Sequence, residues 1–237
     1  MSSRAVQIAS ATAVDTGANA EVVRRAARAL SSGEVIAIPT DTVYGLAAAI
    51  DRQDAIQRLY TLKGRPAEKA IPVLIADPTD ISKLTPRVPA MAARLAQAFW
   101  PGALTLVFPA LPGLPAGVTT LAADGTKTVA VRVPDNPLAR AIIAAAGGAL
   151  AVTSANRSGA APATEASDVR ELGLPRPLFV VDGGRAAGGT PSTIVLATTD
   201  RPEILREGAI PMAAITAVLT DTGPVIGDSR SQGMISR

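Results

Sequence analysis

The stretch NAEVVRRAARALSSGEVIAIPTDTVYGL, residues 19–46, decides the fold because it joins a helix, a buried strand and a polar loop. Apolar side chains recur at helical spacing over residues 19–32, which predicts a helix with one face packed on a core. The run EVIAI at 34–38 predicts a short buried strand. The polar loop PTDTVYGL at 39–46 follows directly, and in α/β proteins ligands gather at strand ends of this kind.

The rest of the chain continues this alternation of helices and strands. Helical periodicity predicts further helices at 54–63, 89–99, 136–146, 165–171 and 211–219. Short apolar or alternating runs predict strands at 71–76, 103–108, 128–133, 149–153, 178–181, 192–197 and 203–206. The segment 109–127 is rich in Pro, Gly and Thr, so we expect an irregular loop there. The alternation favours a single α/β domain whose twisted sheet mixes parallel and antiparallel strands and is flanked by helices.

The chain has 237 residues, a length that suits one substantial domain with short additional segments. We expect residues 1–18 to be an N-terminal extension, residues 19–219 to form the domain, and residues 220–237 to be a flexible tail. No apolar run approaches the length of a membrane span, and the N-terminus lacks the apolar centre of a secretory signal. We therefore expect a cytoplasmic protein with no membrane contact.

The composition excludes several kinds of chemistry. The chain contains neither His nor Cys, which excludes disulfides, thiol nucleophiles, Ser-His triads and zinc sites built from those residues. Lys and Arg total 23 against 20 acidic residues, so the net charge is +3. This weak basic bias permits contact with RNA or with anionic substrates without requiring it. Aromatic residues are only 3%, which disfavours a surface that stacks on nucleic-acid bases.

Four polar loops adjoin predicted strands and are the candidate binding segments: 39–46, 63–69, 153–159 and 182–193. Loop 63–69, KGRPAEK, concentrates three cations around a Gly-Arg-Pro break, and such cations bind phosphate groups. Loop 182–193 is glycine-rich, which lets backbone amides approach an anion, although it matches neither a P-loop nor a dinucleotide fingerprint. The alternative is a purely structural role: a hydrogen-bonded turn for 39–46, a solvated basic loop for 63–69, and a turn or helix cap for 153–159.

Two arginines occupy strands that are otherwise apolar. Arg132 lies between Val131 and Val133, and Arg206 ends the strand predicted at 203–206. A charged side chain in such a position either faces solvent or points into a polar pocket. Both arginines are therefore candidates for binding an anionic ligand.

Taken together, these loops and strands resemble the YrdC family. The matching segments occur in the family's order and span residues 33–208. They are PTDTVYGL (39–46), LKGRPAEKAIPVL (62–74), WPGALTLVF (100–108), TVAVRVP (128–134), TSANRSG (153–159), PSTIV (191–195) and ILREG (204–208). The resemblance implies a twisted mixed sheet with a concave, positively charged cavity of the YrdC-like kind.

The resemblance also implies an activity, that of an L-threonylcarbamoyladenylate synthase. Such a nucleotidyltransferase makes L-threonylcarbamoyl-AMP from L-threonine, bicarbonate and ATP, and it releases pyrophosphate. This is the first step of t6A37 modification of tRNA, so a tRNA threonylcarbamoyl transferase complex would act downstream. Magnesium (Mg2+) is expected with ATP as substrate, and no acidic cluster in the sequence marks a dedicated metal site. The chain resembles the family's short, single-domain form rather than the members with a second C-terminal domain.

By matching motif positions, the resemblance implies three groups of site residues. Lys63 and Arg65 would act electrostatically in catalysis. The residues lining the ATP site would be Arg65, Lys69, Thr128, Asn156, Thr164 and Arg206. The residues holding L-threonine would be Thr40, Arg132, Ser154 and Ser192. Arg132 is a natural partner for the carboxylate of the amino acid.

Two other functions remain open at this stage. One is a non-catalytic double-stranded RNA-binding factor in ribosome maturation, which would use the basic cavity and includes a possible direct tRNA contact. The other is a carbamoyl-transfer module like the YrdC-like domain of hydrogenase maturation proteins. Those proteins are longer and carry Cys-rich zinc modules, whereas this chain contains no Cys. Pyrophosphate release in the presence of threonine, bicarbonate and ATP separates the synthase from the RNA-binding factor.

Overall fold

The computed structural model describes residues 7–10, 16–174 and 179–220 of the chain. Its helices are α1 (Thr16–Ser31), α2 (Gln53–Lys63), the 3-10 helix η1 (Pro78–Lys83), α3 (Ala90–Phe99), α4 (Pro137–Ala145), α5 (Ala166–Glu171) and α6 (Met212–Thr220). Its strands are β1 (Gln7–Ser10), β2 (Ile36–Ile38), β3 (Gly45–Ala49), β4 (Val73–Ile75), β5 (Leu104–Pro109), β6 (Thr119–Leu121), β7 (Lys127–Arg132), β8 (Ala149–Ser154), β9 (Phe179–Asp182), β10 (Thr193–Leu196) and β11 (Glu203–Arg206).

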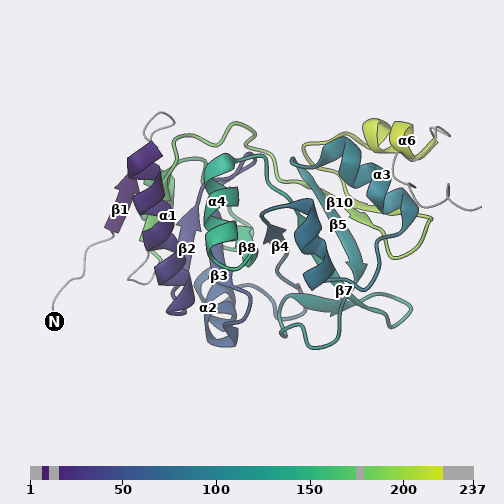
Figure 1. Cartoon of the computed structure of the whole chain (residues 1–237), viewed down its shortest axis with the longest axis horizontal. Coiled ribbons are helices and arrows are strands. Elements are labelled where there is room, and N and C mark those ends of the chain that lie inside the picture. The colour runs from purple at the N-terminus through teal and green to yellow at the C-terminus, as the bar shows by residue number, and fades with distance from the viewer. Residues whose placement is uncertain (1–6, 11–15, 175–178, 221–237) are drawn as a thin grey trace, which may run out of the picture.

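The described strands form one mixed sheet in the order β1-β9-β2-β3-β8-β4-β7-β5-β10-β11, and β6 pairs with β7 beside this path. The pairs β1–β9, β9–β2, β4–β7 and β5–β10 are parallel, and the remaining pairs are antiparallel. Figure 1 shows α1 and α4 toward one end of the sheet and α3 with α6 toward the other. The expected α/β class, with a mixed sheet flanked by helices, is confirmed.

Strand register divides the side chains between two faces of the sheet, because successive side chains of a strand point in opposite directions. On one face, Val131 and Leu106 are register partners and belong to a core shared with α2, α3, α5 and α6. On the other face, Leu74 is the register partner of both Leu150 and Arg132. Leu74 and Leu150 belong to a second core, which they share with α1 and α4.

Local sequence explains how the two helices of the second core form. In α1, Val22, Ala26 and Leu30 recur every four residues and are all buried, which is the expected amphipathic stripe. At the start of α4, the side chain of Asn136 accepts a hydrogen bond from the Ala139 N–H at 2.9 Å. α1 and α4 then pack side by side over the strands (Figure 1).

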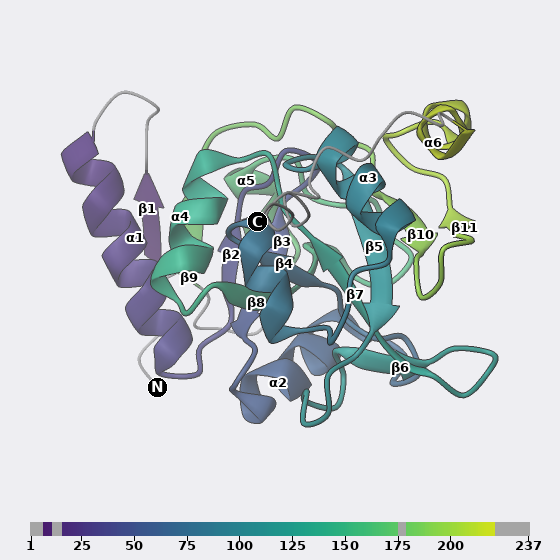
Figure 2. The ribbon, with the colours of Figure 1, turned by 45° about the vertical axis from the view of Figure 1, so that its right-hand side comes forward.

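The second core stops partway along its face of the sheet. Its strand residues come from β9, β2, β3, β8 and β4, and we call the part over β9, β2, β3 and β8 the covered half. The outward-facing residues of β7, β5 and β10 on this same face belong to neither core and border a cavity. We call this part the open half. Figure 2 shows β6 extending from β7 at the open end, with β11 and α6 beside β10 and α3.

Two strands lie where none was expected. Residues 7–10 form β1, which pairs with β9, and α1 begins at Thr16, so the expected extension over 1–18 contributes to the sheet and to α1. β3 begins at Gly45, inside the loop expected over 39–46. Its sequence GLAAA has low intrinsic strand propensity, but it pairs with β2 on one side and with β8 on the other. Tertiary pairing therefore overrides the local preference.

Two further elements were also missed. The segment 109–127, expected to be irregular, contains β6, a three-residue strand held by β7. η1 follows β4 and is capped by Asp77, whose carboxylate accepts from the Thr79 N–H. The expected tail from 220 begins with the last residue of α6, and 221–237 lies outside the described residues. In the part that the structure describes, no helix has both the length and the apolar character that crossing a membrane requires.

Candidate active site

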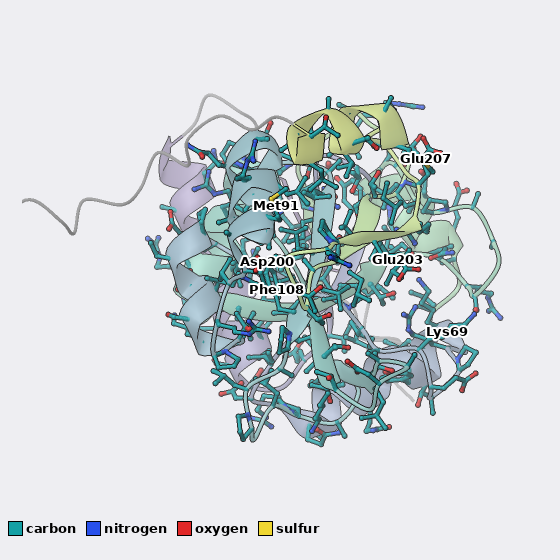
Figure 3. All side chains as sticks on the ribbon, turned by 90° about the vertical axis from the view of Figure 1, so that its right-hand side faces the viewer. Lys69, Met91, Phe108, Asp200, Glu203 and Glu207 are labelled. Carbon is teal, nitrogen blue, oxygen red and sulfur yellow. The ribbon has the colours of Figure 1, made fainter. Side chains whose placement is uncertain are left out.

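A cavity of about 600 Å³ lies on the open half of the sheet face. Outward-facing residues of β5, β7 and β10 form much of its wall. Further lining residues come from the segments 40–45 and 65–70, from β4, β6 and β11, and from the end of β8. The charged residues that line it are Arg65, Glu68, Lys69, Arg132, Glu203 and Arg206. Because cations outnumber carboxylates among these residues, positive charge exceeds negative charge in the lining. Figure 3 shows Lys69 and Glu203 on the same side of the molecule.

Arg132 is the buried cation of this lining, with only 5% of the residue exposed. Its Nε donates to the Gly102 carbonyl at 2.8 Å, its Nη1 to Thr42 Oγ1 at 2.9 Å, and its Nη2 to Asp41 Oδ1 at 2.6 Å. Burial lowers the pKa of Arg132 and the Asp41 carboxylate opposes that shift. The guanidinium remains charged, and these three contacts leave further N–H groups available to a ligand.

The Thr40 hydroxyl, beside Arg132, is fully engaged within its own loop. It donates to the Val43 carbonyl at 2.6 Å and accepts from the N–H groups of Thr42 and Val43, each at 3.2 Å. Because Thr40 has given its single hydrogen to Val43, Thr42 is the donor in the 3.0 Å contact between the two hydroxyls. Thr42 Oγ1 in turn accepts from Arg132, so the orientation of this small network is determined.

Ser192, just before β10, and Thr105 of β5 form a second hydroxyl pair in the cavity wall. Ser192 Oγ and Thr105 Oγ1 are 2.8 Å apart, and both residues are buried. Arg206 of β11 donates from Nη2 to the Ser192 carbonyl at 2.7 Å. Burial lowers the pKa of Arg206, and the charge of Arg65 adds to the effect. Two cations from distant parts of the chain, Arg65 and Arg206, therefore line the same cavity.

The position of Arg65 is set by the end of α2, which it follows by two residues. Gly64 closes the helix in the left-handed conformation at φ +61°, a geometry that favours glycine. Arg65 then donates from Nε to the Lys69 carbonyl at 2.7 Å and from Nη2 to the Ala70 carbonyl at 2.6 Å. Loop 65–70 is thus folded around its own arginine, which holds that cation at the cavity.

Lys63 lies behind the cavity wall, with 6% of the residue exposed. Four acceptors share the three hydrogens of its Nζ: Thr153 Oγ1 at 3.0 Å, the Ser154 carbonyl at 2.8 Å, Ser154 Oγ at 2.7 Å and Asn156 Oδ1 at 2.8 Å. Burial lowers the pKa of Lys63 to about 8, and the charge of Arg65 adds to this. Because every partner is an acceptor, the ammonium ties the end of β8 to α2.

Most of the predicted site residues line this one cavity: Thr40, Arg65, Lys69, Thr128, Arg132, Ser154, Ser192 and Arg206. Lys63, Asn156 and Thr164 are not among the lining residues. Asn156 contacts Lys63 and the Ala160 carbonyl, and Thr164 donates to Asp168 at the start of α5. These three side chains support the wall and the neighbouring loops.

Sequence reasoning missed the groups that orient the predicted residues. Asp41, Thr42 and Thr105 hold Arg132 and Ser192, and Glu68 and Glu203 bring negative charge to the lining. The alternation of β5 could have identified Thr105, since it is polar and its neighbours in the strand are apolar. The ion pair between Asp41 and Arg132 joins residues that are far apart in the chain, and no local pattern signals it.

The cavity does not contain a ready-made metal centre. Among the residues that the structure describes, no group of three or more His, Cys, Asp or Glu side chains is placed to hold a metal ion. Glu68 and Glu203 line the cavity, whereas Asp41 is committed to Arg132. Divalent ions prefer several oxygen ligands, so a cation here would depend on oxygens brought by a ligand.

The fold and the cavity together define an α/β protein with a cavity, lined by more cations than carboxylates, on the uncovered part of a mixed sheet. The family model for Sua5, YciO and YrdC proteins, which carries the description "Telomere recombination", matches residues 28–208. The chain belongs to this family.

Its similarity to curated relatives extends over most of the chain. The threonylcarbamoyl-AMP synthase of Bacillus subtilis is 40% identical over 203 residues, which are 86% of this chain and 57% of that protein. The synthase of Pyrococcus abyssi is 36% identical, over 83% of this chain and 57% of that protein. The synthase of Halorhodospira halophila is 37% identical, over 70% of this chain and 92% of that protein. The chain therefore spans just over half the length of the first two relatives and most of the third.

Solved structures show the same fold. Pyrococcus abyssi Sua5 complexed with L-threonine superposes with a TM-score of 0.79 at 33% identity, covering 91% of this chain and 61% of that chain. Escherichia coli YciO superposes with a TM-score of 0.78 at 24% identity, covering 89% of this chain and 100% of that chain, which bears on the fold alone.

Proposed function

We propose that this chain synthesises L-threonylcarbamoyl-AMP from L-threonine, bicarbonate and ATP, with release of pyrophosphate. The observation that carries the proposal is the joint lining of one cavity by Arg65, Lys69, Arg132 and Arg206. It is supported by relatives named threonylcarbamoyl-AMP synthase and by the similar Sua5 structure that contains L-threonine. The activity would start the t6A modification at position 37 of tRNA.

The charge of the cavity suits this set of substrates. Each reactant carries negative charge: a carboxylate on threonine, bicarbonate itself, and the triphosphate of ATP. Bringing these anions together is unfavourable unless fixed cations offset their repulsion, and fixed cations also stabilise charge that develops on a transferring phosphoryl group. The absence of His and Cys from the chain is no obstacle, because such a reaction depends on positioning and electrostatics.

The proposed chemistry has two steps. The threonine amine attacks the carbon of bicarbonate, a C–N bond forms, and water leaves to give a carbamate. A carbamate oxygen then attacks the α-phosphorus of ATP, the bond to the bridging oxygen breaks, and pyrophosphate leaves. Arg132 would bind the threonine carboxylate near Ser154 and Ser192, while Arg65, Lys69 and Arg206 would face the phosphates.

Three predicted site residues, Lys63, Asn156 and Thr164, do not line the cavity and would act by holding other residues in place. Thr164 would do so through its hydrogen bond to Asp168. Lys63 donates only to wall atoms, so it would supply charge and hold Ser154 in place rather than move a substrate proton. Asn156 completes that arrangement, since its Oδ1 accepts from Lys63 and from Ser154 Oγ at 2.8 Å in each case. Thr128, whose hydroxyl donates to the Thr120 carbonyl, lines the cavity and would face ATP directly.

Magnesium would enter as part of the substrate. The triphosphate supplies the oxygen ligands that Mg2+ prefers, and Glu68 and Glu203 are the carboxylates of the cavity lining that could face the bound ion. The partners proposed beyond the substrates are a tRNA threonylcarbamoyl transferase complex that uses the product, and the tRNA itself. Because the proposed product serves the modification of tRNA, we place the activity in the cytoplasm.

The deciding experiment measures pyrophosphate release by the purified chain with L-threonine, bicarbonate, ATP and Mg2+. The synthase proposal predicts release that requires all three substrates and yields a product with the mass of L-threonylcarbamoyl-AMP. The alternative, a non-catalytic double-stranded RNA-binding factor, predicts no release, together with RNA binding that weakens steeply as salt increases. That second pattern would contradict the synthase proposal.

A further inference from the structure

Arg132 is held in the cavity wall by three hydrogen bonds to the protein. Its side chain is 6% exposed, and that of Asp41, its ion-pair partner, is 17% exposed. A charged group this buried loses its hydration and needs partners that replace it. Asp41 supplies the opposite charge, while Thr42 and the Gly102 carbonyl accept from the other nitrogens.

Asp41 is itself fixed from several sides. Its Oδ1 also accepts from the Asp135 N–H at 3.1 Å, just beyond β7. Its backbone carbonyl accepts from the Gly188 N–H at 3.0 Å. A Cβ at Gly188 would lie only 2.9 Å from that carbonyl oxygen, so the glycine-rich loop can pack against Asp41 only because it lacks a side chain there. The carboxylate that faces Arg132 is therefore itself held in one place.

Asp41 also offsets the repulsion between the positive charges of Arg132 and Arg206. Arg206 acts on Arg132 as a like charge and lowers its pKa, so repulsion favours moving the two cations apart. A flexible arginine in that field would turn toward solvent, where its charge is screened. The Asp41 carboxylate at 2.6 Å opposes this movement and keeps the guanidinium in the wall.

We propose that Asp41 is a positioning residue: it holds Arg132 in the one orientation that binds the carboxylate of the amino-acid substrate. The proposal rests on the proposed function, since it concerns affinity for L-threonine. Asp41 does not touch the reacting atoms. Thr42 is its partner in this task, because it holds the adjacent nitrogen of the same guanidinium.

The test compares Asp41→Ala, Asp41→Asn and Thr42→Val in steady-state assays with threonine and ATP varied separately. For Asp41→Ala we expect KM for threonine to rise about tenfold or more, while kcat and KM for ATP stay within about threefold. Asp41→Asn keeps an oxygen that accepts from Arg132, so its KM for threonine should rise only about threefold. Thr42→Val removes one acceptor without changing shape and should also give about a threefold rise.

The matched control is Asp54→Ala, which removes a carboxylate that pairs with Arg52 and Arg58 on α2, outside the cavity lining. It should leave both KM values unchanged. The positioning role is contradicted if Asp41→Ala leaves KM for threonine within about twofold, or raises both KM values equally. Should Asp41→Ala fail to fold, Thr42→Val decides alone, because an unchanged KM for threonine in that variant overturns the proposal.

A binding measurement separates this proposal from the proposed function. Calorimetric titration with L-threonine and with its methyl ester, which lacks the carboxylate charge, requires no turnover. Wild type should prefer L-threonine, and Asp41→Ala should lose most of that preference. If wild type itself releases no pyrophosphate and shows no such preference, the proposed function fails and the positioning proposal fails with it. If wild type behaves as expected and Asp41→Ala keeps the full preference, only the positioning proposal is overturned.

Discussion

The covered and open halves of one sheet face differ in what their outward side chains are made of. Over the covered half, Ile36, Ala47 and Leu150 point toward α1 and α4 and are wholly buried. Over the open half, Thr105 and Arg132 occupy the equivalent positions and line a cavity. The strands are continuous in register between the halves, since Leu74 pairs with both Leu150 and Arg132.

This difference in outward side chains explains why the cavity lies over the open half. An apolar helix laid over Arg132 would cut off from water the guanidinium N–H groups that its three protein contacts leave over, at a cost of several kcal/mol for a charge. The opposite faces of the same strands, with Leu106 and Val131, are apolar and are covered. A change of residue type on one face of β5 and β7 therefore turns a packing surface into a binding surface.

The largest expected effect is on catalysis and comes from the open half. Arg65→Ala or Arg132→Ala should each reduce kcat/KM for synthesis by about a thousandfold, because each removes a cation proposed to face an anionic substrate. The measurement is pyrophosphate release, with circular dichroism to show that the fold is retained. A near-normal rate at saturating substrate in both variants would contradict the assignment of these arginines.

The next effect is on stability. The same substitution, Leu→Ala, is expected to cost more stability in the covered half than in the open half. Leu150 is wholly buried under α4, whereas Leu196 is half-buried in the cavity wall on the same face. Leu150→Ala should lower the free energy of unfolding by about 3 kcal/mol, because it leaves a cavity in the core. Leu196→Ala should lower it by about 1 kcal/mol, because less apolar surface is lost.

Urea denaturation measures both free energies, and substrate titration accompanies it. Leu150→Ala should leave KM values unchanged, whereas Leu196→Ala should shift the KM of at least one substrate. Equal losses of stability in the two variants would show that the halves do not differ as described.

The remaining effect depends on pH and concerns Lys63, which ties the end of β8 to α2. Its pKa in the folded protein is lowered to about 8, whereas an unfolded lysine titrates at about 10.4. Between these values the unfolded state binds more protons, so the Lys63 contribution to the free energy of unfolding becomes more favourable as pH rises from about 8 to about 10.4. Lys63→Met should remove that gain.

Urea denaturation at several pH values tests this, and nitrogen NMR of labelled lysine side chains observes the titration directly. Exposed Lys127 serves as the internal comparison in the spectra. Titration of Lys63 together with the exposed lysines would contradict the role of burial.

The local sequence pattern predicted most elements of the fold, because their apolar residues recur with the spacing at which side chains are buried. In β7, alternate residues Thr128, Ala130 and Arg132 line the cavity while Val129 and Val131 enter the core, as strand periodicity requires. β3 was missed because its alanines have no strand preference, and β6 because three residues that are exposed or only partly buried leave no pattern. Both strands exist through pairing with distant segments, which a local window does not contain.

The site could be predicted only in part for a related reason. The motifs supplied the cations, but the cavity depends on which strand faces remain uncovered. The placement of Lys63 had an unused signal, since Ile56, Leu59, Tyr60 and Lys63 form the buried stripe of α2 at helical spacing. Nothing local indicated Asp41 as the partner of Arg132, because the two residues meet only after the sheet has formed.

The position of Trp100 close to Gly102, the carbonyl partner of Arg132, has a consequence for the fluorescence of the protein. The chain contains one tryptophan, Trp100, which is 8% exposed and whose indole N–H donates to the Leu104 carbonyl at 2.7 Å. Two residues further on, the Gly102 carbonyl accepts from Arg132. All tryptophan emission from this protein thus originates beside the peptide that holds the buried arginine. Fluorescence of the unlabelled chain can therefore follow how that arginine responds to a ligand, even with substrates that do not react.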